Sequence, residues 1–198
     1  MTKIIGLTGG IGSGKTTVSK YIKSKGYAVY IADDEAKKIM LTAKVIKEVV
    51  AVFGSEVLDD LGYLDRKKLA ALVFNDALAL GKLNAIVHPK VKNHFNNWLK
   101  KQQKKGADFV FKEVAILFET KGENYCDFVL LVTAPLEVRL NRVISRDNSN
   151  KKNVLARMNN QMPEEEKVKK SDFVITNISL KETYNQVDDF LKEIENSQ

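Results

Sequence analysis

The chain has 198 residues, of which 44% are hydrophobic and 29% are charged, a size that suits one domain with a sizeable core. It has no apolar run near the roughly 18 residues that span a bilayer, and its start, MTKIIGLTGG, is not typical of a signal peptide. We therefore expect a cytoplasmic protein with no membrane partner. The net charge of +7 suits nucleic acid, an acidic membrane or a phosphorylated small molecule, and does not decide among them.

Short apolar runs alternate with helical patterns along the chain. This alternation predicts an α/β fold in which a parallel sheet is covered by helices on both faces. Five strands are expected, over residues 3–8, 27–31, 109–114, 127–132 and 173–176. The single cysteine, Cys126, cannot form an internal disulfide and is predicted to pack in the core.

The segment between the second and third predicted strands reads almost wholly as helix and is too long for a plain crossover. Apolar residues recur in it at helical spacing, among them Val45, Val49 and Val52. We expect one domain over residues 1–198 with a helical insertion over residues 60–105 that ends at Gly106, a predicted C-cap. Near the end of the chain, Ser179 and Glu182 form a capping box that predicts a docked terminal helix.

The stretch GLTGGIGSGKTT places a glycine-rich loop between a predicted strand and a predicted helix. Gly9, Gly14, Lys15 and Thr16 match the pattern G-x-x-x-x-G-K-[ST], whose amides surround phosphate oxygens at a helix start. We expect Lys15 to reach the β and γ phosphates and Thr16 to hold Mg²⁺. The loop therefore predicts binding of a nucleoside triphosphate through Gly9, Gly10, Gly12, Ser13, Gly14, Lys15, Thr16 and Thr17.

Several kinds of nucleotide-binding protein carry such a loop. A GTPase would need a guanine-reading N-K-x-D stretch, and the sequence has none. A small-molecule kinase is favoured, and kinases of the nucleoside monophosphate or shikimate type remain alternatives. A regulatory module with an RNA-binding surface is another alternative, but no aromatic-rich motif for single strands supports it.

A kinase needs a carboxylate beside the acceptor hydroxyl, and in an open α/β sheet such residues follow the strands. Asp33 and Asp34 directly follow the second predicted strand, although helix capping is an alternative role for them. Glu113 and Glu119 flank the end of the third, where a carboxylate that orders magnesium is expected. For Glu119, a merely exposed position is the alternative.

Phosphoryl transfer also needs cations around the transferring group. In PLEVRLNRVISRD, Arg139, Arg142 and Arg146 share one helical face, and Leu136, Leu140 and Val143 define another. Arg157 follows after a polar loop, and we assign it to substrate binding. We expect a mobile lid over residues 135–170 that carries these arginines. The alternative is a salt-bridged surface helix.

The motifs together resemble the dephospho-CoA kinase family over essentially the whole chain. Besides the glycine loop, they are ADDEA, LDRKKLAALVF, LNAIVHPKV, EVAILFE, RLNRVISRD, ARMNNQM and DFVITN, in the family's order and spacing. The resemblance implies transfer of the γ-phosphate of ATP to the 3′-hydroxyl of dephospho-CoA, with Mg²⁺. It implies no nucleic-acid partner, and we expect a monomer or a small homo-oligomer.

The resemblance also implies roles for single residues. Asp33 would be the base that activates the acceptor, and Glu113 would order Mg²⁺ and contact substrate. Arg142 and Arg146 would be catalytic with Lys15, and Arg142 would also bind ATP, whereas Arg139 stands where the family has glutamine. His88 and Pro89, taken to start a helix, and Lys92 would belong to a CoA-binding subdomain, and Asn177 would lie on the adenine side.

Three positions depart from the family's pattern. Ile31 replaces the first aspartate of a D-x-D motif, and Glu113 and Ala115 replace the aspartate and proline of the third-strand motif. Lys92 stands where arginine is common, which removes a bidentate fork for an anion.

Overall fold

The computed structural model describes residues 1–74 and 76–196. In chain order its elements are β1 (Lys3–Thr8), α1 (Lys15–Ser24), β2 (Ala28–Ile31), α2 (Ala32–Met40), α3 (Ala43–Phe53), η1 (Ser55–Val57), α4 (Arg66–Phe74), α5 (Ala77–Lys104), β3 (Phe109–Glu113), η2 (Gly122–Tyr125), β4 (Phe128–Thr133), α6 (Leu136–Asp147), α7 (Lys151–Asn159), α8 (Glu164–Lys169), β5 (Phe173–Thr176) and α9 (Leu180–Asn196). Within the described residues, no helix combines the length and apolar character needed to cross a membrane.

The chain divides into two compact units. The first consists of Met1–Ile31 and the chain from Gln102 onward, and the second is Ala32–Lys101. The first unit holds a five-stranded sheet in the order β2-β3-β1-β4-β5, with every pair parallel. The predicted α/β class and five-stranded parallel sheet are confirmed.

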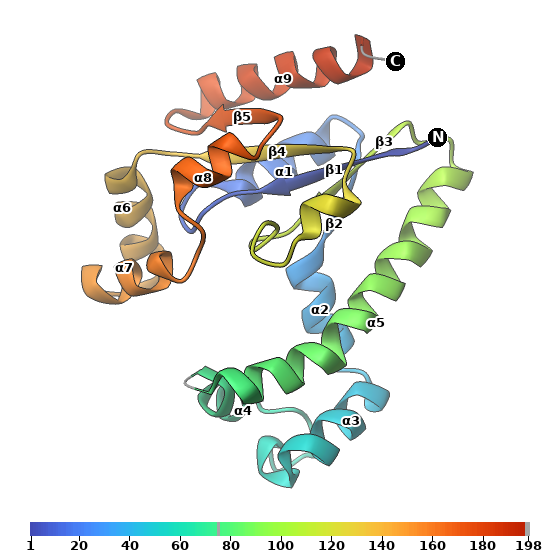
Figure 1. Cartoon of the computed structure of the whole chain (residues 1–198), viewed down its shortest axis with the longest axis vertical. Coiled ribbons are helices and arrows are strands. Elements are labelled where there is room, and N and C mark those ends of the chain that lie inside the picture. Colours follow the sequence, from blue (N-terminus) through green and yellow to red (C-terminus); the bar gives the residue numbers. More distant parts are fainter. Residues whose placement is uncertain (75, 197–198) are drawn as a thin grey trace. The chain divides into compact units, whose positions relative to one another are not determined.

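The two faces of this sheet are covered by different segments. Ile5 and Leu7 on β1 point into a core that α1 and α9 close from one side (Figure 1). On the other side, a Cβ atom at Gly6 would lie 2.8 Å from the Sγ atom of Cys126 and 2.9 Å from Leu117. Glycine in the middle of β1 thus allows the β3–β4 connection to pack directly on the sheet.

Cys126 is half-buried in that packing, as predicted for a core residue. Burial raises the pKa of its thiol to about 11. The thiol is therefore protonated and unreactive near neutral pH.

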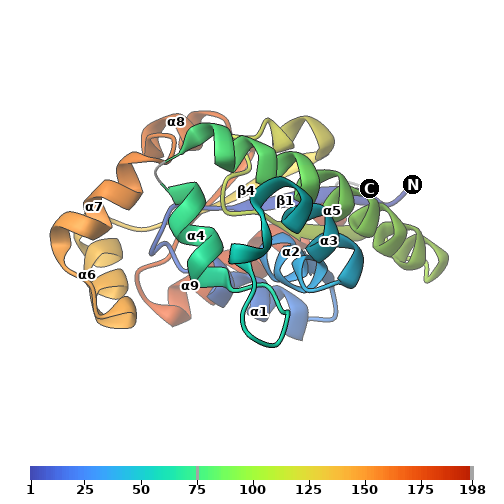
Figure 2. The same ribbon diagram turned by 90° about the horizontal axis from the view of Figure 1, so that it is seen from below.

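The second unit has its own core. α3, α4 and the first part of α5 surround it (Figure 2), and its buried residues are Val45, Val49, Val57, Leu64, Leu69, Leu83 and Val87. This unit begins at Ala32 rather than near residue 60, so it also contains α2 and α3. Val52, which the sequence pattern placed on the apolar face of α3, is 46% exposed.

The expected helix start at His88 and Pro89 is wrong, because both residues lie inside α5. A proline within a helix costs roughly 3 kcal/mol, since it lacks an N–H group and its ring crowds the preceding turn. Leu83, Val87 and Phe95 are buried at helical spacing on both sides of Pro89. Burial of this continuous stripe offsets the cost of the proline.

Candidate active site

The glycine loop lies between β1 and α1, at the central strand of the sheet. Gly12 and Gly14 have φ angles of 81° and 89°, in the left-handed region that residues with a Cβ atom rarely adopt. A Cβ atom at Gly14 would lie 1.9 Å from the Nδ2 atom of Asn177. The loop therefore has the tightly packed backbone, possible only with glycine at these positions, that is typical of a phosphate cradle.

Lys15, the first residue of α1, lies close to the acidic residue Glu113 at the end of β3. Its Nζ atom is 3.6 Å from the Oε1 atom of Glu113, which ends β3 and pairs in register with Leu7 of β1. Glu113 is 6% exposed, and its Oε2 atom has no hydrogen-bond partner. The Oγ1 atom of Thr8 and the Oγ atom of Ser13 are also buried and unpaired. Buried polar atoms without partners indicate a site that a polar ligand completes.

Asn177 and Arg142 lie beside the loop, as the sequence predicts, and both contact the protein itself. The Nδ2 group of Asn177, which is 2% exposed, donates to the carbonyl oxygen of Ser13 at 2.8 Å, and its Oδ1 atom accepts from Thr183 at 3.0 Å. Arg142 donates to the carbonyl oxygens of Asn177 and Ile178 at 3.0 and 3.3 Å. These bonds hold the loop in shape, and the nucleotide contacts of both residues stay predictions.

The segment over residues 135–170, which we expect to be a lid, contacts the tip of the loop. The Nη1 atom of Arg139 is 3.1 Å from the Oε2 atom of Glu164, and a Cβ atom at Gly10 would lie 2.6 Å from that same nitrogen. The N–H group of Ile11 donates to the Oε1 atom of Gln161 at 2.9 Å. Arg139, which the resemblance made the less secure arginine, is thus the one that lies against the loop.

Arg146 and Arg157 share one carboxylate. Two nitrogens of Arg146 donate to Asp147 at 2.7 and 3.1 Å, and Arg157 donates to it at 2.7 Å. Hydrogen bonds from Arg146 and Arg157 hold the pKa of Asp147 far below its usual range. The structure therefore shows the salt-bridged arrangement that was the alternative for these arginines, and their phosphate contacts stay predictions.

Glu119 is exposed, as the alternative for it expects, but its carboxylate is paired with α8 and the segment before it, and not with Glu113. Its Oε1 atom accepts from the N–H group of Met162 at 2.9 Å and lies 3.1 Å from the Nζ atom of Lys167, which is fully buried. The sequence analysis assigned no role to Gln161, Glu164 or Lys167. Gln161 stood in a quoted motif, and Lys167 looked like one charge among several in EEEKVKK.

The predicted acceptor residues lie in the second unit. Asp33 is exposed in the first turn of α2, and its neighbour Asp34 pairs with Lys37 at 2.8 Å. His88 and Lys92 are exposed one turn apart on α5, so they share a face of that helix.

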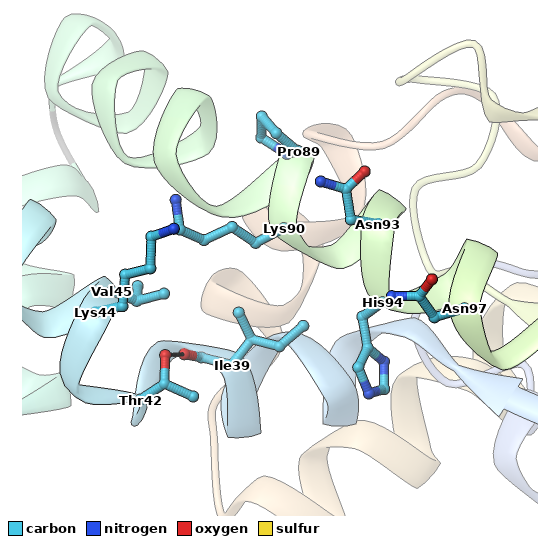
Figure 3. Close-up of a pocket in the computed structure, with 9 residues that line it drawn as sticks. All are labelled: Ile39, Thr42, Lys44, Val45, Pro89, Lys90, Asn93, His94 and Asn97. Atoms are coloured by element: carbon cyan, nitrogen blue, oxygen red, sulfur yellow. Dashed lines mark hydrogen bonds between the residues drawn. The ribbon is translucent and has the colours of Figure 1, made fainter.

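A pocket of about 430 Å³ lies within the second unit, between the α2–α3 junction and α5 (Figure 3). Its lining residues are Ile39, Thr42, Lys44, Val45, Pro89, Lys90, Asn93, His94 and Asn97. Lys90 is paired with Glu48 at 2.5 Å. The pocket combines apolar side chains with amides and ammonium groups. The sequence analysis named Val45 as an apolar helical position and Pro89 as part of a CoA-binding subdomain, and it pointed to none of the other lining residues.

The five-stranded parallel sheet with the phosphate loop on its central strand defines the fold of a P-loop kinase. The family model of dephospho-CoA kinase matches residues 3–182, and the chain belongs to this family. The chain is 43% identical over 192 residues to the dephospho-CoA kinase of Fusobacterium nucleatum, covering 96% of this chain and 98% of the relative. It is 39% identical over 199 residues to that of Listeria innocua, with full coverage of both chains.

Solved structures agree with this assignment. A crystal structure from Thermus thermophilus matches with a TM-score of 0.86 and 38% identity, over 99% of this chain and 97% of that one. The dephospho-CoA kinase of Campylobacter jejuni matches with a TM-score of 0.67 and 27% identity, over 98% and 97%. Shikimate kinase from Acinetobacter baumannii, at 16% identity and a TM-score of 0.53 over 100% and 96%, shares the fold.

Proposed function

We propose that this chain transfers the γ-phosphate of ATP to the 3′-hydroxyl group of dephospho-CoA, giving coenzyme A and ADP. The observation that carries the proposal is the phosphate loop with Lys15 and Glu113 beside it, in a chain of this family. The loop amides and the start of α1 would bind the inner phosphates, and Lys15 would reach the outer ones.

The residues at the loop fit a divalent cation, because Glu113 keeps one buried carboxylate oxygen without a partner and Thr16 is exposed at the start of α1. When bound, Mg²⁺ would neutralise charge on the β and γ phosphates. Thr16 and Glu113 would hold it, Glu113 through an ordered water or directly. Asp33 would accept the proton of the ribose hydroxyl group and orient it for attack.

We further propose that the pocket of the second unit takes the pantetheine side of the acceptor. That part of the molecule is a chain of amides and methylenes joined to a diphosphate. Asn93 and Asn97 would bind its amides, Ile39, Val45 and Pro89 would pack against its methylenes, and Lys44 would face the diphosphate. His88, Lys92 and Arg157 stay assigned to binding of the acceptor substrate.

A coupled assay for ADP release tests the function. The expected result is ADP formation that depends on dephospho-CoA and is far slower with AMP or shikimate. Asp33→Asn should lower kcat about a hundredfold or more and leave ATP affinity nearly unchanged, since it removes a base and not a phosphate ligand. Asp34→Asn is the matched control, because Asp34 pairs with Lys37. Equal kcat in the Asp33→Asn variant and the wild type would remove Asp33 from this role.

We also propose a cytoplasmic location and a monomeric or small homo-oligomeric state. Cell fractionation and light scattering after gel filtration are the measurements for these two points.

A further inference from the structure

One hydrogen bond joins Gln161, between α7 and α8, to the tip of the phosphate loop. The N–H group of Ile11 donates to Oε1 of Gln161 at 2.9 Å. A backbone N–H group can only donate, so the oxygen of the side-chain amide must face the loop, and Nε2 offers two N–H donors beside it. Within residues 1–74 and 76–196, this side chain has no other hydrogen bond.

The contacts on both sides of Gln161 hold it in place. The next residue, Met162, donates its N–H group to Glu119 at 2.9 Å. Glu164, which begins α8, pairs with Arg139 at 3.1 Å. The segment is thus anchored to the core, and little freedom is left for its side chain to lose when a ligand arrives.

The same contacts place the amide beside the loop backbone at Gly10. A Cβ atom there would lie 2.6 Å from the Nη1 atom of Arg139 and 3.7 Å from Oε1 of Gln161. The glycines from Gly12 onward and the start of α1 form the cradle for the inner phosphates, and Lys15 spans the β and γ phosphates. Gly10 and Ile11 precede that cradle, so lid side chains over them border the outermost phosphate.

We infer that Gln161 donates a hydrogen bond from Nε2 to an oxygen of the γ-phosphate and so makes the site prefer ATP to ADP. This inference rests on the proposed kinase function. During transfer, charge is spread over three equatorial oxygens of the γ-phosphate, and fixed donors stabilise it. Gln161 supplies such a donor without adding charge, next to an arginine that Glu164 already neutralises.

The substitution Gln161→Glu removes the hydrogen-bond donor of the side-chain amide and keeps an oxygen acceptor. The carboxylate has the same shape and still accepts from the N–H group of Ile11, but it cannot donate and it repels the γ-phosphate. A hydrogen bond to a charged group corresponds to a change of about tenfold or more, so we expect ATP to bind at least about tenfold more weakly. ADP affinity should change less than about twofold, and kcat should fall with the ATP affinity.

The measurements are calorimetric titrations of ATP and ADP, each with Mg²⁺, and melting curves without nucleotide. Gln103→Glu is the control, since Gln103 is exposed near the end of α5 and the variant adds the same charge. Without nucleotide, Gln161→Glu should have the same melting temperature as the wild type. Gln161→Ala loses the hydrogen bond to Ile11 and should have a lower melting temperature.

Two results would overturn the inference. In one, Gln161→Glu lowers the affinities for ATP and for ADP by the same factor, which indicates a purely structural role. In the other, it changes neither affinity. A wild-type protein that prefers ATP through Gln161 but transfers no phosphate to dephospho-CoA would contradict the proposed function instead. A wild-type protein that binds no ATP would contradict both.

Discussion

At the scale of single residues, Lys167 has the most unusual environment. Its side chain is fully buried, and its Nζ atom is 3.1 Å from Glu119. A buried ammonium group needs a counter-charge, because burial removes its hydration. Burial by itself raises the pKa of Glu119, but hydrogen bonds, chiefly from the N–H group of Met162, and Lys167 hold it below its usual value. The pair therefore ties α8 to the β3–β4 connection while both groups are charged.

We expect Lys167→Met to lower the free energy of unfolding at pH 7 by about 1 kcal/mol, because the carboxylate of Glu119, an exposed residue, loses its counter-charge. Since the pKa of Glu119 is lower in the folded state, its contribution is present above its unfolded pKa of about 4.5 and is lost as pH falls through the folded pKa. The variant should therefore lose less stability than the wild type between pH 5 and about 3.

Urea denaturation at a series of pH values measures both effects. Lys169→Met, at an exposed position of the same helix, is the control and should be near neutral. A Lys167→Met variant as stable as the control at pH 7 would show that the ion pair contributes nothing.

At the scale of elements, α9 begins with the capping box that the sequence predicts. The Oγ group of Ser179 donates to Glu182 at 2.7 Å and accepts from the N–H group of Glu182 at 3.3 Å. The helix then buries Val187, Phe190, Leu191 and Ile194 against the sheet. A correct start is needed for this stripe to face the sheet.

Ser179→Ala should lower the free energy of unfolding by about 1 kcal/mol, because the first N–H groups of α9 lose their acceptor. Ser179→Asp restores an acceptor and should recover most of the loss. Chemical denaturation followed by circular dichroism measures both variants. Equal stability of the alanine variant and the wild type would show that the box does not stabilise α9.

The elements differ in how well the sequence predicts them. Strands such as β1 and β5 are short apolar runs bounded by polar or glycine residues, and their bounds match the prediction. The glycine loop is predicted equally well from the sequence, because its φ angles near 80° to 90° require glycine at particular positions. α5 is different, since its continuity through Pro89 depends on burial along its whole length, which no local signal carries.

Contacts between distant segments were harder still to predict. Gln161 meets Ile11 across 150 positions of the chain, and Glu119 meets Lys167 from a separate connection. Each of these residues is an ordinary surface type by composition. Only the folded chain shows that the segment between α7 and α8 reaches the phosphate loop.

At the scale of the whole molecule, the residues predicted for ATP and those predicted for the acceptor belong to different units. The phosphate loop, Glu113, Asn177 and the lid belong to the first unit, and Asp33 and His88 belong to the second, with the pocket. The start of the second unit at Ala32 gives no signal in the sequence, because β2 runs directly into α2 without an intervening glycine or proline. Substitutions in one unit should therefore affect one substrate more than the other.

Asn93→Trp tests this division, because Asn93 is exposed on α5 and lines the pocket. An indole ring there should fill the pocket, and we expect the KM for dephospho-CoA to rise at least about tenfold, a loss comparable to removing a few buried contacts. ATP affinity should change less than about twofold, since every predicted ATP ligand lies in the first unit. Asn96 is exposed on the same helix outside the pocket, so Asn96→Trp controls for the added ring.

Steady-state kinetics with each substrate varied in turn gives both KM values. A rise in both KM values would indicate general damage to the protein, and no rise in either would show that the acceptor binds elsewhere.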